Sequence, residues 1–388
     1  MAGERACVVA RSQLRWTGQL PNVPELVELA LWSKGFSSTS ACCTVGLVTT
    51  ANDDRTLLVV GSYTAASNGN GEGIGTFWRE GRTGELTPAG SLELDSPSWL
   101  TPHPTLPVLY AVNETAEGAI STVAVAENGT LELLDSLPTG GADPCHLAIT
   151  PDGRFLLCAN YSGGSLAAFA LGPDGIPTVR TALVQHEGTG PGADRQEAAH
   201  VHMAMVDESG TLVSAVDLGT DEIRSYRLGE EGELIPLSVS TLPAGTGPRQ
   251  LVRRPGTNHA YVVGELAASL LTVREEPPGT FSVENSTPAT LAPGGDNLPG
   301  QLTLHGDRLY LSNRGPEKIT EFAFDGVLPK AVADHGTGEW PRHFSIVGEQ
   351  CYVASQSDDA IRAYDLATWR LIGTYPVGSP AFVAPWRH

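Results

Sequence analysis

From about residue 56 onward, the chain is a succession of short apolar stretches separated by polar turns. The segment from Gly245 to Ser269 shows this pattern well. Gln250 to Arg253 and His259 to Val263 are predicted strands, the second rich in β-branched and aromatic residues, and a turn containing proline, glycine and asparagine separates them. Because the two strands of a hairpin run antiparallel, Arg249 and Glu265 are expected at the same edge.

A short unit recurs along the chain, consisting of a proline, two variable residues and an apolar residue. Its copies begin at Pro97, Pro144, Pro248, Pro299, Pro341 and Pro380. A seventh copy fits if His200 takes the proline position, which gives His200-Val201-His202-Met203. Successive copies lie 39 to 56 residues apart. Such periods are typical of propeller blades built from four strands each.

A second repeated position follows each copy after 14 to 17 residues, at the end of the next predicted strand. Its members are Asn113-Glu114, Asn160-Tyr161, Asp217-Leu218, Gly264-Glu265, Asn313-Arg314 and Ser355-Gln356. The unit at Leu57 to Tyr63 has no such proline, and the last unit stops after its first strand at Val383. We therefore predict an all-β, seven-bladed β-propeller over residues 55–388, closed by N- and C-terminal strands that share one blade.

Residues 1–54 differ in character from the repeats and are predicted to form a poorly ordered extension with a short helix at Pro24 to Trp32. This stretch lacks the features of a secretory signal, and no run of 18 apolar residues predicts a membrane span. The six cysteines match no zinc or redox motif. Free thiols in a reducing compartment, and hence a cytoplasmic protein, are the simplest interpretation.

The formal net charge of −20 and the pI near 4.8 argue against nucleic acids and anionic membranes as partners. An anionic small molecule would have to be attracted by a local cluster of arginines. Two long irregular stretches, Glu187 to Ala199 and Leu291 to Gly300, interrupt the repeats and are expected to lie over one face.

Equivalent positions of the blades form rings around the central channel of a propeller, so polar residues of the two repeated positions should converge on one mouth. The gathered set is His146, His202, Arg249, Gln250, Glu265, Asn313, Arg314, Arg342 and His343, with Asn113, Glu114, Asn160, Tyr161 and Asp217 alongside. So many arginines, histidines and glutamates exceed what strand ends require, which favours a functional mouth over a merely solvated channel.

Each residue type has more than one possible role. Arg249 and Arg314 suit the capture of carboxylate or phosphate and the stabilisation of an oxyanion, or they form simple pairs with Glu265 or Glu114. His202 is either a packed channel histidine or a proton carrier. Glu265 is a candidate base, or a carboxylate that fixes an arginine. Asp217 is interpreted as part of a strand-end turn rather than a metal site.

Motifs for other chemistry are weak or missing. The glycine-rich stretch at Gly69 to Gly75 lacks the lysine of a phosphate-binding loop, no serine lies in a nucleophile-elbow sequence, and no helical pair of metal ligands is present. We therefore predict that no metal ion and no cofactor takes part.

Several of these motifs together resemble one known family. They are Asn160-Tyr161-Ser162-Gly163-Gly164-Ser165, His200-Val201-His202, Asp217-Leu218-Gly219-Thr220-Asp221, Gly245-Thr246-Gly247-Pro248-Arg249, Glu265-Leu266 and Ser312-Asn313-Arg314-Gly315. In this order they are similar to the signatures of the lactonase seven-bladed propeller family, which includes the bacterial-type 6-phosphogluconolactonase and the carboxymuconate-cyclising enzyme. The resemblance covers about Leu57 to Val383.

The resemblance implies a metal-independent enzyme of carbohydrate metabolism that acts on a small anionic lactone. The proposed active residues of the cyclising member match His202, Arg249, Arg314 and Glu265, with His200 as the less favoured histidine. Residues predicted to bind the substrate around them are His200, His146, Asn160, Asn313, Arg342 and His343. Gln250 and Gly264 depart from the residues common in the family.

The preferred hypothesis is hydrolysis of 6-phosphogluconolactone to 6-phosphogluconate, a step of the pentose phosphate pathway. Arg249 and Arg314 would bind the phosphate and the carbonyl oxygen, and His202, assisted by Glu265, would activate water. One alternative is a carboxymuconate-type cycloisomerase. Another is a non-catalytic propeller that binds a metabolite or a protein, and a weaker one is a calcium-dependent six-bladed lactonase.

Overall fold

The structure, a computed structural model, describes residues 55–292 and 295–386. The predicted N-terminal extension at residues 1–54 and its helix at residues 24–32 lie outside the described residues. No helix in the described ranges is long and apolar enough to cross a membrane.

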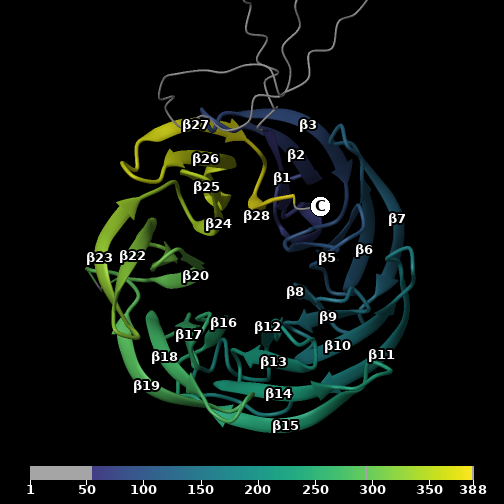
Figure 1. Ribbon diagram of the computed structural model, residues 1–388, viewed down its shortest axis with the longest axis vertical. Coiled ribbons are helices and arrows are strands. Elements are labelled where there is room, and N and C mark those ends of the chain that lie inside the picture. Colours follow the sequence, from purple (N-terminus) through teal and green to yellow (C-terminus); the bar gives the residue numbers. More distant parts are fainter. Residues whose placement is uncertain (1–54, 293–294, 387–388) are drawn as a thin grey trace, which may run out of the picture. The chain divides into compact units, whose positions relative to one another are not determined.

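Seven antiparallel sheets of four strands each surround a central axis (Figure 1). The sheets comprise β1 (Arg55–Ser62), β2 (Gly73–Glu80) and β3 (Leu86–Glu93) with β28 (Pro380–Pro385); β4 (Leu100–Pro102), β5 (Val108–Asn113), β6 (Ala119–Val125) and β7 (Leu131–Pro138); β8 (Pro144–Ile149), β9 (Phe155–Asn160), β10 (Ser165–Leu171) and β11 (Pro177–Gln185); β12 (Val201–Val206), β13 (Leu212–Asp217), β14 (Glu222–Leu228) and β15 (Leu234–Thr241); β16 (Pro248–Arg253), β17 (His259–Gly264), β18 (Ser269–Glu275) and β19 (Phe281–Pro288); β20 (Leu298–His305), β21 (Arg308–Arg314), β22 (Lys318–Asp325) and β23 (Leu328–Gly336); and β24 (Pro341–Val347), β25 (Gln350–Ser355), β26 (Ala360–Asp365) and β27 (Leu371–Pro376). Two short 3-10 turns, Ala65–Ser67 and Gln356–Asp358, complete the described elements. The predicted all-β, seven-bladed propeller is confirmed, and the six-bladed alternative does not fit.

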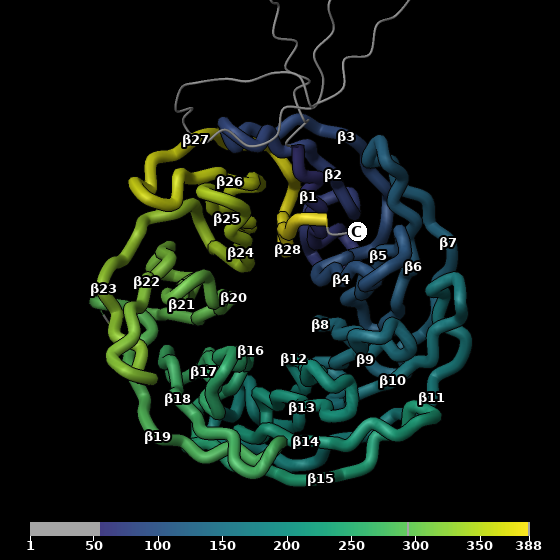
Figure 2. Tube along the Cα trace, in the orientation of Figure 1, coloured from purple at the N-terminus to yellow at the C-terminus, as the bar shows by residue number. Residues whose placement is uncertain are grey.

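The ring is closed by one blade that contains strands from both ends of the propeller. β28 pairs antiparallel with β1, with Val383 opposite Val60, and Figure 2 shows the two strands side by side. The predicted sharing of a blade by the terminal strands is therefore confirmed. Each sheet keeps two edge strands, the innermost at the channel and the outermost at the rim of the propeller.

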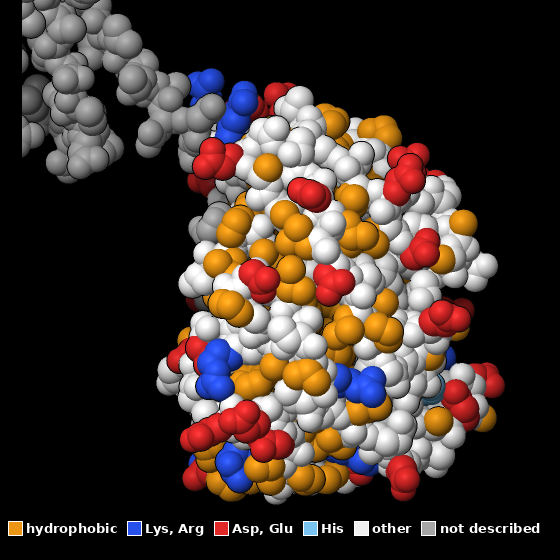
Figure 3. Space-filling model, turned by 90° about the vertical axis from the view of Figure 1, so that its right-hand side faces the viewer, with side chains coloured by type: hydrophobic (Ala, Val, Ile, Leu, Met, Phe, Trp, Pro, Cys, Tyr) orange, Lys and Arg blue, Asp and Glu red, His pale blue; other side chains and the backbone are white. Residues whose placement is uncertain are grey.

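The hydrophobic core lies between neighbouring sheets. The second strand of each blade is buried on both faces, which explains why β9 and β25 read as near-continuous apolar runs. The outermost strands are half exposed: Leu133 in β7 and Val179 in β11 keep 44% and 56% of their surface accessible. Figure 3 shows apolar side chains interspersed with acidic ones on one side of the molecule.

Val383 tests the contribution of the closing strand. Its side chain is fully buried and packs in a cluster with Leu58, Val60 and Ile361. Val383→Ala is expected to lower the free energy of unfolding by about 2 kcal/mol, because two buried methyl groups are lost and a small cavity remains. Chemical denaturation measures this change. Val332→Ala, on an outer strand at 47% exposure, is the control and should change the stability little; equal losses would contradict the packing described.

All the innermost strands except β4 share an irregularity that determines what faces the channel. In β8 the register shifts between Pro144 and His146, and in β16 between Pro248 and Gln250. The same shift occurs in β12, β20, β24 and β28. Each shift is a β-bulge, which leaves one residue, or two in β20, outside the ladder and turns its side chain. The bulged residues are Cys145, His202, Arg249, Gly300-Gln301, Arg342 and Ala381.

The pairing of β12 corrects the sequence alignment by one residue. We predicted His200 at the proline position of this unit, but Val201 pairs with Asp217 as Pro144 pairs with Asn160. His202 is therefore the counterpart of Arg249. Without a proline in this blade, the residue pattern did not reveal the bulge, and the alignment was placed one residue too early.

Candidate active site

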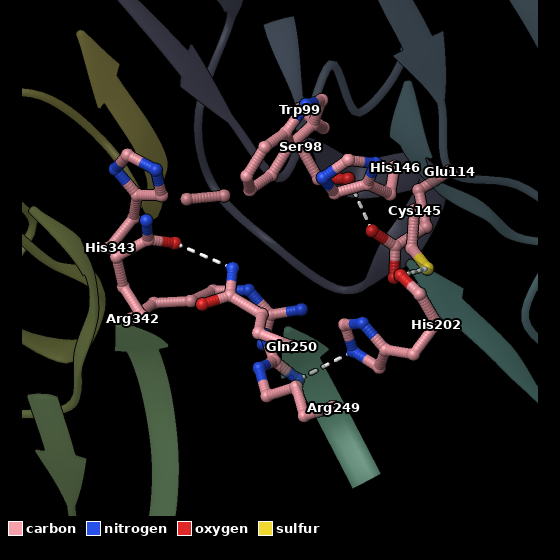
Figure 4. A pocket seen from close by; sticks show the side chains of 12 residues that line it. Ser98, Trp99, Glu114, Cys145, His146, His202, Arg249, Gln250, Arg342 and His343 are labelled. Atoms are coloured by element: carbon pink, nitrogen blue, oxygen red, sulfur yellow. Dashed lines mark hydrogen bonds between the residues drawn. The ribbon is translucent and has the colours of Figure 1, made fainter. Parts of the chain in front are cut away.

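Each blade contributes one residue from its innermost strand, or in one blade from just before that strand, to a small central cavity. These residues are Ser98, Cys145, His202, Arg249, Gln301, Arg342 and Ala381, and the cavity is completed by Trp99, Glu114, His146, Gln250 and His343 (Figure 4). The cavity has a volume of about 20 Å³, counted as the space open to the centre of a water molecule. The bulges thus explain how residues far apart in the sequence meet on the axis of the propeller.

Arg249 connects two of the predicted catalytic residues. Its Nη1 atom lies 2.7 Å from Oε2 of Glu265 and 2.6 Å from Nε2 of His202 (Figure 4 shows the latter contact). A guanidinium group can only donate, so Nε2 of His202 accepts. Burial, reinforced by the Arg249 charge, holds the pKa of His202 well below its ordinary value. The ring is therefore neutral, with its proton on Nδ1.

Glu265 is the centre of a buried arginine cluster. Arg249 and Arg314 contact Oε2 at 2.7 and 3.0 Å, and Arg195 contacts Oε1 at 3.0 Å. Burial alone would raise the pKa of Glu265, but Arg314 and Arg249 outweigh it and hold this pKa well below its usual range. With both oxygens occupied, Glu265 remains ionised and is suited to position arginines rather than to accept a proton.

Arg314 reaches Glu265 but does not line the cavity. Its Nε donates to the carbonyl of Leu298 at 2.7 Å, its Nη2 donates to that of Pro299 at 3.2 Å, and its guanidinium lies 5.5 Å from the ring centre of Trp340. Burial lowers its pKa to about 9. Most of its donors are used within the protein, which indicates a role in holding Glu265.

A second charged cluster lies across the cavity. Arg342 donates to the hydroxyl of Tyr63, which in turn donates to Oε2 of Glu114 at 2.8 Å, and Ser98 donates to the same oxygen. The Arg342 guanidinium also lies over the Tyr63 ring, 4.7 Å from its centre. Together, the two clusters contain four arginines and two carboxylates.

The other cavity histidines are neutral as well. Burial, with the Arg249 charge, lowers the pKa of His146 to about 3 and that of His343 to about 3. Both rings pack against Trp99, with centres 4.2 and 5.4 Å away. The clusters around the cavity therefore carry a surplus of two positive charges at neutral pH.

Three predicted substrate-binding residues lie elsewhere. His200 bonds to Glu197 at 3.0 Å and stacks on Tyr161. The side chains of Asn160 and Asn313 are fully buried, and their amides bond inside the blades, to Ser165 at 3.0 Å and Thr320 at 3.0 Å. The structure does not bring these three to the cavity, and we leave them out of the proposed site.

Asp217 ends its strand in the expected way. Its Oδ1 accepts from the backbone N–H groups of Gly219 and Thr220 at 3.0 and 3.2 Å, which confirms the predicted turn. Its Oδ2 lies 2.7 Å from Nδ1 of His186. The described residues contain no group of three or more histidine, cysteine or acidic side chains arranged to hold a metal ion.

Comparison with known proteins agrees with this geometry. Residues 57–371 match the model of a family described as lactonase, seven-bladed β-propeller. The chain belongs to this lactonase family. The resemblance stated from the sequence is thereby confirmed, and so is the prediction that the protein is an enzyme of the lactonase class.

Relatives in this family share a modest identity over most of their length. The 6-phosphogluconolactonase of Bacillus subtilis is 27% identical over 77% of this chain and 87% of its own. That of Serratia proteamaculans is 30% identical over 76% and 91%. The solved structure of the periplasmic gluconolactonase of Pseudomonas aeruginosa superposes with a TM-score of 0.77, at 27% identity, over 85% of this chain and 99% of that one.

The candidate set from the sequence did not include Arg195 and Tyr63, which bond to the charged residues of the site. It also did not include the lining residues Ser98, Trp99, Cys145, Gln301 and Ala381. Arg195 belongs to no repeated position and lies in the irregular stretch at residues 187–199. Tyr63 directly follows β1 in the one unit without a proline. The sequence offered one signal for Arg195: it is an arginine in an irregular stretch that we predicted to lie over one face of the propeller.

The buried histidines predict a pH-dependent stability. His146 and His343 stay neutral in the folded protein but take up a proton in the unfolded chain below about pH 6.5. The unfolded state then binds more protons, so the free energy of unfolding should fall by about 1.4 kcal/mol per histidine per pH unit below that value. Denaturation curves at pH 7.5, 6.5 and 5.5 measure this loss. His343→Gln should lose less stability; identical pH slopes would contradict the prediction.

Proposed function

We propose that the central cavity hydrolyses a small anionic sugar lactone, with 6-phosphogluconolactone as the preferred substrate. The observation that carries the proposal is the surplus of positive charge around the cavity, in a chain whose net charge is −20. The two charged clusters beside the cavity contain four arginines and two carboxylates, and the three cavity histidines are neutral. A ligand with about two negative charges would balance this site.

The names of the relatives support the same reaction class. The Bacillus and Serratia proteins are named 6-phosphogluconolactonases, and the Pseudomonas protein is named a gluconolactonase. These names agree on hydrolysis of a gluconic acid lactone and differ on the phosphate group. Our preference for the phosphorylated lactone therefore rests on the charge of the site.

Hydrolysis requires donors for the carbonyl oxygen, which becomes negative in the transition state. Arg249 and Arg342 line the cavity and are the cations able to reach such an oxygen. The sequence suggested Arg314 as a second donor to the substrate, but its guanidinium already contacts Glu265 and donates to backbone carbonyls. We assign the oxyanion to Arg249, with Glu265 and Arg314 holding it in place.

His202 is the proposed general base, and its contact with Arg249 couples catalysis to binding. While Arg249 donates to Nε2, this nitrogen has no lone pair available for a proton. A lactone whose oxygen attracts Arg249 would free Nε2. The ring would then take a proton from water as the water attacks the carbonyl, and return it to the ring oxygen when the C–O bond breaks, which yields the hydroxy acid.

The carboxymuconate alternative fits the arginines but not the histidines. Protonating a carbon calls for a strong general acid such as an imidazolium ion, whereas burial keeps the rings of His202, His146 and His343 neutral. Hydrolysis is therefore the better assignment. A non-catalytic propeller predicts binding without turnover of any lactone.

A panel of three substrates tests the proposal. The purified protein is incubated with 6-phosphogluconolactone, with gluconolactone and with a carboxylated muconate, and the products are followed by NMR against the spontaneous reaction. We expect the phosphorylated lactone to be hydrolysed fastest and the muconate to remain. Cyclisation of the muconate, or no acceleration of either lactone, would overturn the assignment.

A cytoplasmic location is part of the same proposal. It rests on the free, buried cysteines Cys145, Cys158 and Cys351 and on a phosphorylated substrate. The Pseudomonas relative is described as periplasmic, so cell fractionation of the native protein is the deciding measurement.

A further inference from the structure

The connection between β11 and β12 is longer than the equivalent connections around it. It spans residues 186–200, whereas the preceding one spans 139–143 and the following one 242–247. These connections lead from the outermost strand of one blade to the innermost strand of the next. They therefore run inward, and this one carries an extra arginine, Arg195, to Glu265, the partner of the cavity residue Arg249.

Buried hydrogen bonds hold this connection in place. The side chain of Gln196 is fully buried, and its Nε2 donates to the carbonyl of Leu218 at 2.9 Å and to Asp221 at 2.8 Å. The N–H of Gly192 donates to Oε1 of Gln196 at 3.1 Å. The neighbouring Arg195 is thus presented from an anchored segment.

Arg195 is the most exposed cation of the Glu265 cluster. Its side chain keeps 39% of its surface accessible, against 8% for Arg249 and 4% for Arg314. Its Nη2 lies 3.0 Å from Oε1 of Glu265, and its Nε donates to the hydroxyl of Tyr161 at 3.0 Å. Nη1 makes no hydrogen bond to the described part of the chain. Arg195 therefore joins the buried cluster to the solvent.

We propose that Arg195 binds the phosphate of the substrate and makes the enzyme select phosphorylated over unphosphorylated lactones. This inference rests on the proposed function. Arg195 is accessible to solvent and can meet a phosphate at the outer end of the substrate, while the lactone carbonyl reaches inward to Arg249. Arginine suits this task because its planar group can form two bonds to a phosphate. Glu265 keeps two other arginines if Arg195 turns to the substrate.

The test compares Arg195→Gln with the wild type on two substrates, 6-phosphogluconolactone and gluconolactone. We expect kcat/KM for the phosphorylated lactone to fall about 10- to 100-fold, mainly through KM, since one charge-assisted contact is lost. The value for gluconolactone should change less than about twofold, and Arg195→Lys should restore part of the loss. Arg254→Gln is the matched control with no change expected, because Arg254 is a partly exposed arginine that donates to the carbonyl of Gly326 and does not line the cavity.

Two results would overturn the inference: an equal fall for both lactones, which indicates a structural role, or no fall for either. Calorimetry with 6-phosphogluconate and with gluconate provides a readout that needs no turnover. Weaker binding of 6-phosphogluconate alone by Arg195→Gln supports the inference, and equal binding by wild type and variant contradicts it. A wild type that binds 6-phosphogluconate but hydrolyses no lactone would refute the proposed function and leave Arg195 as an anion site.

Discussion

Replacing Arg249 with methionine is expected to lower kcat/KM for 6-phosphogluconolactone by about 10²- to 10³-fold, with the main loss in kcat. Loss of one preorganised donor to a developing oxyanion has an effect of this size. Arg249 also contacts His202 at 2.6 Å, so its loss removes the proposed coupling between binding and the base. Initial rates at pH 7, corrected for the spontaneous reaction, measure the effect.

A matched control lies on the same strand. Arg253 pairs with Glu275 at 2.6 Å, at the far end of β16 from Arg249. Arg253→Met removes an arginine from a carboxylate without touching the cavity and should keep nearly full activity. If Arg249→Met retained more than a third of wild-type activity, the assignment of Arg249 to the oxyanion would be wrong.

Replacing Glu265 with glutamine is expected to lower the free energy of unfolding by about 3–5 kcal/mol. Its carboxylate balances three arginines while only 1% exposed, and an uncompensated buried charge costs about this much. Activity should fall as well, because Arg249 loses its orienting partner. Chemical denaturation at pH 7 measures the stability.

Glu275→Gln is the corresponding control. Glu275 pairs with Arg253 alone among the described arginines, and both side chains are more exposed, at 12% and 23%. Its replacement should lower the stability less than that of Glu265 does. Equal losses for the two variants would show that the Glu265 cluster is no more critical than an ordinary ion pair.

The blades and their closure could be predicted because they depend on local signals. A proline lies at or near the start of six of the innermost strands, and turns at regular distances separate the buried strands. The register at β12 could not be predicted, because this strand has Val201 where the repeats of the other blades have a proline. The structure places His202 in the ring of Arg249, and His200 lies outside it.

Only part of the site could be predicted, because a sequence pattern does not show towards which face of a strand each side chain points. Asn313 and Arg314 are adjacent, and successive side chains of a strand point to opposite faces, so only one of them can face a given neighbour. Residue type did not show which one. The contact between Arg342 and Tyr63 joins residues 279 positions apart and depends on the closure of the whole ring. The position of Arg195 depends on the path of a long connection, and this path does not follow from the repeats.

The most direct test of a lactone hydrolase at this cavity is the consumption of 6-phosphogluconolactone followed by NMR, with wild-type protein and with His202→Gln. The wild type should convert the lactone to 6-phosphogluconate well above the spontaneous rate. His202→Gln should lose at least about 10²-fold of this acceleration, as expected for removal of a general base. Spontaneous rates with the wild type, or equal rates for both proteins, would contradict the account.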